Sequence, residues 1–151
     1  MKNSNYTGDT YKIALWAFYI MIAVGVIIGF IIYSGMKAPT TIFENNKMEI
    51  SSAGYNIEFQ YSDILKIDTI HSLPEILSRT NGFGASPLFK GHFKMEGIEN
   101  ALLFVDIEKP PFIYIKLKEQ SVFINFNDSN ETIALFYQIK LKVSGLKSSS
   151  Q

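Results

Sequence analysis

The 151-residue sequence contains no cysteine. It therefore cannot form a disulfide framework, a thiolate metal site or a lipidated cysteine. The 14 basic residues balance the 14 acidic ones, so no overall field favours nucleic acid or a strongly acidic partner. Arginine occurs only at Arg79 and histidine only at His71 and His92. Few groups are thus present for catalysis, and we expect neither an enzyme nor a nucleic-acid-binding protein.

The chain does contain one long stretch without charge, from Ile13 to Met36, which predicts a transmembrane helix over 13–36. As a helix it would reach about 36 Å, enough to cross a hydrocarbon core of about 30 Å with some tilt. Trp16, Tyr19 and Tyr33 lie near its ends, where aromatic rings favour the membrane interface. A cleaved signal peptide is the alternative, but its apolar region would be shorter, and no small-x-small cleavage site stands out. We therefore expect a single-pass protein of the cell membrane.

The lysines that flank this stretch do not decide which way the helix is inserted. Lys2 and Lys12 precede it, and Lys37 and Lys47 follow it. The positive-inside rule therefore gives a tie, and the side of the membrane on which the domain lies stays undetermined.

Two glycines inside the stretch make it a candidate helix–helix contact. Gly25 and Gly29 form a G-x-x-x-G, a spacing that lets two membrane helices approach closely. Since glycine is also common in membrane helices for other reasons, a homodimer through this face is one of two open interpretations.

Composition divides the rest of the chain into a polar tail (1–12), a tether (37–46), a domain (47–141) and a second polar tail (142–151). Seven segments of the domain alternate apolar and polar residues, which is typical of antiparallel strands with one dry and one largely wet face. The apolar positions of these segments are Met48 and Ile50; Ile57, Phe59 and Tyr61; Leu65, Ile67 and Thr69; Phe89, Phe93 and Met95; Ala101, Leu103, Val105 and Ile107; Ile113, Ile115 and Leu117; and Val122, Ile124 and Phe126.

The connections predict two hairpins. A turn around Gly97 would pair Phe93 with Leu103 and Phe89 with Ile107, which sets Lys90 opposite Asp106. A turn at Glu119-Gln120 would likewise pair Leu117 with Val122.

After the last strand the spacing changes from two to three and four, which predicts a C-terminal helix. Asp128 and Glu131 have the spacing of a capping box, and Ile133, Phe136 and Tyr137 fall on one helical face. We expect this helix to end near Gln138 and to close the open end of a curled sheet.

Seven antiparallel strands and one capping helix resemble the pleckstrin-homology fold, and three sequence stretches resemble the bacterial pleckstrin-homology-like (PH-like) domain family. These are "ISSAGYNIEFQYSDILKI" (50–67), "LPEILSRTNGFG" with "GHFKMEG" (73–97), and "KPPFIYIKLKEQSVFINFNDSNET" (109–132). The resemblance implies a membrane-associated protein with a mainly β, seven-stranded barrel or sandwich and no shared catalytic residues.

The candidate binding residues are Arg79, Lys90, His92 and Lys94, which could together attract an anion. The alternative is that Lys90 pairs with Asp106 and the others are solvated. Ligands for a metal are not clustered in the sequence, and the glycines of "NGFGASP" match no phosphate-binding motif, so no cofactor is expected. The segment His71–Leu88 is read as a long loop of the kind that is often functional.

Two functions therefore remain. The first is a non-catalytic binding or scaffolding module at the bilayer with a protein partner. The second is a sensor of lipid headgroups or other anions that uses the segment from 71 to 94.

Overall fold

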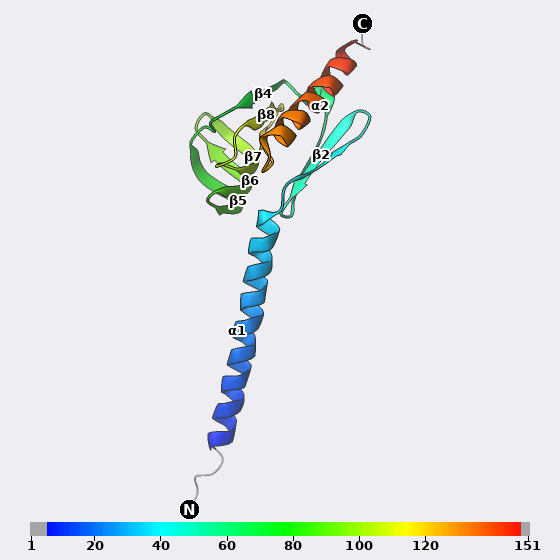
Figure 1. Ribbon diagram of the computed structural model, residues 1–151. Coiled ribbons are helices and arrows are strands. Elements are labelled where there is room, and N and C mark those ends of the chain that lie inside the picture. Colours follow the sequence, from blue (N-terminus) through cyan, green and yellow to red (C-terminus); the bar gives the residue numbers. More distant parts are fainter. Residues whose placement is uncertain (1–5, 149–151) are drawn as a thin grey trace, which may run out of the picture. The chain divides into compact units, whose positions relative to one another are not determined.

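The computed structural model describes residues 6–148 and separates into two compact units, Met1–Ser34 and Gly35–Gln151. The fold is mainly β, with an apolar helix at the N-terminus and a second helix at the C-terminus (Figure 1). Its elements are α1 (Tyr6–Met36), β1 (Thr40–Phe43), β2 (Lys47–Ser52), β3 (Tyr55–Gln60), a 3-10 turn η1 (Tyr61–Asp63), β4 (Lys66–Ile70), β5 (Ile76–Ala85), β6 (Leu88–Met95), β7 (Ile98–Asp106), β8 (Phe112–Lys116), β9 (Ser121–Ile124) and α2 (Ser129–Ser148).

Helix α1 contains the charge-free stretch. Its segment Tyr11–Tyr33 has a mean hydropathy of 2.6 and is long and apolar enough to cross a membrane. Its side chains are exposed rather than packed in a core, as expected of a helix whose apolar surface is covered by lipid. The helix begins earlier than expected, because residues 6–12 of the predicted polar tail are already helical, while residues 1–5 lie outside the described part.

Within residues 6–148, nine strands form two open sheets, so the expectation of a seven-stranded antiparallel barrel or sandwich is wrong in the number and the pairing of the strands. Sheet A has the order β1-β2-β3, and sheet B has the order β4-β8-β9-β7-β6-β5. The two additional strands lie where the sequence suggested irregular chain. Strand β1 falls within 37–46, and β5 falls within the segment read as a long loop.

Sheet B is mixed rather than antiparallel. Strands β7 and β9 pair in parallel, with Ala101 opposite Ser121 and Phe104 opposite Ile124. Strand β8 intervenes in the chain but lies on the outer side of β9, to which it pairs antiparallel. The alternation of a strand fixes which residues share a face, but it does not fix the neighbouring strand.

In the middle of sheet B, residues 101–105 of β7 and all four residues of β9 are buried on both faces, which corrects the expectation of one wet face for these two strands. Along β7, Leu102 and Phe104 belong to one hydrophobic cluster (core 1), and Ala101, Leu103 and Val105 belong to another (core 2). All five side chains are at most 1% exposed. Core 1 also contains side chains of sheet A and of α2, so these elements cover one face of sheet B.

Core 2 is covered by the sheet's own edges. Ile70 of β4 and Ile76 of β5 come from opposite edges of sheet B, yet both pack against core 2. The short loop 71–75 joins these two edge strands, and its Leu73 packs on the same cluster. Sheet B therefore curls, and Leu73 of the loop covers core 2 on its concave side.

The two expected hairpins exist, but each register differs from the expected one by two residues. Phe93 lies opposite Ala101 and Phe89 opposite Val105, so Lys90 faces Phe104 rather than Asp106. The faces were nevertheless assigned correctly, because a shift of two residues preserves the alternation.

The second hairpin shows the same displacement. Ile115, not Leu117, lies opposite Val122. The turn is formed by Lys118-Glu119 and is closed by the amide of Leu117, which donates to the carbonyl of Gln120 over 2.9 Å. The expected turn at Glu119-Gln120 was therefore one residue too far along the chain.

Helix α2 starts as expected, but it continues to Ser148. The Asp128 carboxylate accepts from the amide of Asn130 over 2.8 Å. The hydroxyl of Thr132 accepts from the amide of Phe126 over 2.9 Å, a contact that the capping-box spacing of Asp128 and Glu131 did not predict.

The buried stripe of α2 differs from the expected one. Tyr137 is 57% exposed, whereas Leu135 and Ile139 are buried in core 1. The helix as a whole packs against η1, β8 and β4 (Figure 1). Phe136 packs against core 1 as expected, and Lys140 lies over its ring at 5.5 Å. A second apolar turn at Val143 extends the stripe, which explains why the helix does not end near Gln138.

Candidate functional site

The four side chains proposed as an anion-binding patch have different surroundings. Arg79 is exposed on β5, and Lys94 is exposed on β6, where it forms an ion pair with Glu99 at 2.7 Å. His92 is half-buried. Lys90 is only 2% exposed. The patch therefore offers Arg79 and Lys94 to solvent, while Lys90 points into the protein.

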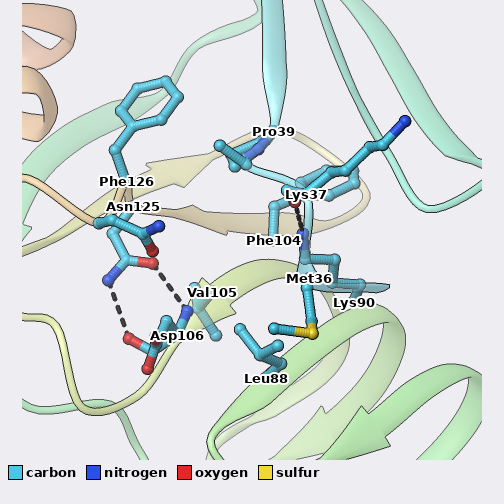
Figure 2. Close-up of a pocket in the computed structure, with 12 residues that line it drawn as sticks. Met36, Lys37, Pro39, Leu88, Lys90, Phe104, Val105, Asp106, Asn125 and Phe126 are labelled. Atoms are coloured by element: carbon cyan, nitrogen blue, oxygen red, sulfur yellow. Dashed lines mark hydrogen bonds between the residues drawn. The ribbon is translucent and has the colours of Figure 1, made fainter. Parts of the chain in front are cut away.

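The ammonium group of Lys90 joins three segments that are distant in sequence. It donates to the hydroxyl of Ser52 on β2 over 2.8 Å, and it also donates to the main-chain carbonyl of Lys37, just after α1 (Figure 2). The hydroxyl of Ser52 donates to the same carbonyl over 3.4 Å. Burial lowers the pKa of Lys90 to about 8, and the carboxylate of Asp106 opposes that shift.

The neighbouring residues of β6 hold the rest of the β2–β3 hairpin tip, residues 52–55. Tyr55 lies against Gly91, where an added Cβ would come within 3.2 Å of the tyrosine ring. Its hydroxyl donates to the side-chain oxygen of Asn81 over 3.2 Å, and its ring meets that of His92 edge-on at 6.4 Å. The tip of sheet A is thus fixed to sheet B by consecutive residues of one strand.

A small cavity of about 10 Å³ lies beside Lys90 (Figure 2). The buried side chain of Asn125 is saturated there: its amide donates to the carbonyls of Asp106 and Lys109, and its oxygen accepts from the amide of Asp106 over 2.9 Å. The volume is about that of one water molecule, so the cavity cannot hold an organic ligand. This region is a structural junction.

A much larger groove lies on the concave side of sheet B. Its volume is about 470 Å³. It is lined by side chains from the 71–75 loop and from four strands or strand ends: His71, Ser72, Leu73, Pro74, Ile76, Phe89, Ile107 and Phe112. The lining contains no lysine, arginine, aspartate or glutamate. Its apolar character suits an uncharged, apolar group.

The sequence indicated only part of this groove. The segment that begins at His71 stood out as irregular, but Phe89 and Ile107 were expected only as core residues, and Phe112 had no assigned role. These residues come together because the sheet curls, and curvature leaves no mark in a two-residue alternation. Among residues 6–148, no group of three or more histidine, aspartate and glutamate side chains could hold a metal ion.

Comparisons of the chain with protein families, with curated proteins and with solved structures give no match. The features of the molecule that bear on its function are therefore the groove, the junction at Lys90 and the apolar helix.

Proposed function

We propose that this protein is a single-pass membrane protein whose folded unit is a non-catalytic binding module for another protein. The observation that carries the proposal is the groove of about 470 Å³ on the concave side of sheet B. Pockets that bind ligands typically have about 300–1,000 Å³ and a mainly apolar lining. The span-forming segment Tyr11–Tyr33 supports placement of this module at a bilayer.

The chemistry of the lining supports a segment with apolar side chains as the partner. Ile107 is 38% exposed at the groove, and Phe89 and Leu73 are half-buried beside it. Partly exposed apolar side chains around a groove contribute most to the binding free energy when an apolar residue of a partner displaces water from the groove. An anionic headgroup would find neither lysine nor arginine among the groove's side chains.

Site-specific photocrosslinking tests this proposal in the full-length protein in its own membrane. A benzophenone side chain would replace Ile107, and a matched control would carry it at Leu65, an exposed apolar residue outside the groove. We expect a discrete protein adduct at position 107 that is absent at position 65. The proposal is wrong if position 107 gives no adduct, or if both positions give the same one.

A sensor of lipid headgroups through Arg79, Lys90, His92 and Lys94 is the second candidate. Burial of Lys90 and the ion pair of Lys94 weaken its support, because two of the cations already have partners. Flotation of residues 35–151 with vesicles of increasing anionic lipid content separates the two functions. Strong binding that falls with added salt would favour the lipid sensor.

We retain the relation to the bacterial PH-like family as a proposal. A C-terminal helix that follows the last strand and packs on the sheet supports it. The parallel β7–β9 pair and the open sheets count against a regular pleckstrin-homology barrel.

A further inference from the structure

The connection between α1 and β1 is held by polar contacts of the folded unit. Pro39 is buried, and the carbonyl of Lys37 accepts hydrogen bonds from both Lys90 and Ser52. The last carbonyls of a helix have no partner within the helix, so donors from elsewhere are needed next to its end. Lys90 supplies one at Lys37, the residue after the last one of α1.

A lysine is an unusual choice for this position. Its side chain is 2% exposed and lies on the core 1 side of β6, where it faces Phe104 across the strands. An apolar side chain of similar length would fill the space without the cost of burying a charge. Buried polar groups of this kind can select one arrangement of segments over others. The arrangement selected here joins the connection to both sheets.

We infer that Lys90 acts as a latch that fixes residues 35–39 to the folded unit and that opens independently of the rest of the domain. When the latch is closed, the carbonyl of the Lys37–Ala38 peptide bond is engaged by Lys90 and Ser52. Lys37 and Ala38 are exposed even when the latch is closed, so what changes on opening is that the carbonyl loses both donors and the connection becomes free to extend into a protease. An extended chain covers about 3.4 Å per residue, so residues 35–39, once released, could span at most about 17 Å in total. The latch thus sets whether this connection is held or free.

Two features make local opening feasible. The contacts that Lys90 makes with Lys37 and Ser52 are hydrogen bonds, and regions held by hydrogen bonds open at lower free energy than core strands. Among the residues described, Lys90 forms no ion pair within 4.0 Å, and the carboxylate of Asp106 acts on it only through space. Opening therefore does not require separation of a salt bridge.

Trypsin provides a direct test, because the bond after Lys37 is itself a tryptic site. The full-length protein in detergent micelles would be digested, and cleavage after Lys37 would be followed by mass spectrometry. Cleavage after Lys116, the last residue of β8, would report global unfolding, because the carbonyl of Lys116 accepts from the amide of Leu65 over 2.9 Å. In the wild-type protein both sites should be cut slowly. In Lys90→Met, cleavage after Lys37 should rise about tenfold or more, as expected for loss of a charged hydrogen-bond donor, while cleavage after Lys116 stays unchanged.

Two further variants keep the test decisive. Lys94→Met removes a lysine from the same strand outside the junction and should leave both rates unchanged. Ser52→Ala removes one partner of Lys90 and should accelerate cleavage after Lys37 by a smaller factor, so it serves if Lys90→Met does not fold. The latch is refuted if cleavage after Lys37 is unchanged in the folded variants. It is also refuted if both sites accelerate together in each variant, because Lys90 would then stabilise the whole domain.

Discussion

The ring of Tyr55, at the tip of the β2–β3 hairpin, lies against the α-carbon of Gly91 on β6. A Cβ at position 91 would come within 3.2 Å of the ring and within 2.5 Å of the Asn81 carbonyl oxygen, and the φ angle of Gly91 is +115°. The close approach of hairpin and sheet thus requires a residue without a side chain. Since residues on either side of Gly91 also contact this tip, the junction depends on the backbone of β6 as much as on its side chains.

Gly91→Ala should therefore lower the free energy of unfolding by about 2–5 kcal/mol, from steric overlap and backbone strain together. Gly97→Ala is the matched control. Its φ angle is +73°, but nothing lies within 4 Å of the added Cβ, so only the strain of about 1–2 kcal/mol applies. Urea denaturation of residues 35–151 would measure both. Equal losses would contradict the close contact at Gly91.

Burial in core 2 predicts a large effect for Phe93. This side chain is 2% exposed, and Phe93→Ala should cost about 3–5 kcal/mol of unfolding free energy. The next residue, Lys94, forms an exposed ion pair, so Lys94→Ala should cost at most about 1 kcal/mol. The same denaturation experiment compares them, and similar losses would show that β6 does not alternate as described.

The lowered pKa of Lys90 predicts a rise of stability at alkaline pH. Below about pH 8 this lysine is charged in both the native and the unfolded state. Between about pH 8 and its ordinary pKa of 10.5, the native state has lost the proton that the unfolded state still binds. The free energy of unfolding therefore increases with pH across this window.

The increase due to Lys90 should be at most about 3 kcal/mol, and the hydrogen bonds of the charged form reduce it. It should appear as a difference between the wild-type protein and Lys90→Met, since all other titrating groups are common to both. Denaturation of residues 35–151 at several values between pH 7 and 10.5 measures this difference. A difference that stays constant with pH would contradict the proposed protonation of Lys90.

The start of α2 depends on one carboxylate. Asp128→Ala removes the acceptor of the Asn130 amide and should cost about 0.5–2 kcal/mol of unfolding free energy. Ser129→Ala, at the exposed next position, should change stability by less than about 0.5 kcal/mol. Thermal unfolding followed by circular dichroism would distinguish them. No loss in Asp128→Ala would mean that the cap does not stabilise the helix.

The faces of most strands and the start of α2 follow from local patterns, because period and capping residues act over a few positions. The burial of β7 on both faces is also indicated by a local sequence pattern. Residues 101–105 read "ALLFV", an uninterrupted apolar run that is typical of a strand without a wet face. The assignment of Ala101, Leu103 and Val105 to one dry face overlooked that Leu102 and Phe104 between them are apolar as well.

No pattern in the sequence near Lys90 predicts that its side chain is buried. Alternation placed it correctly on the face opposite Phe89 and Phe93. That face is buried because a hairpin forty residues earlier in the chain packs over it, and such a contact depends on the order of strands and the curl of sheet B. The groove depends on the same curl, so neither site could be located from the sequence.

The central claim is that Tyr11–Tyr33 anchors an intact binding module in a membrane. Washing isolated membranes at alkaline pH, followed by intact-mass measurement of pellet and supernatant, tests it most directly. A spanning helix resists this treatment because its apolar surface stays in lipid. The account predicts the full 17.1 kDa chain in the pellet. A shorter chain that has lost the helix, or the full chain in the supernatant, would contradict it.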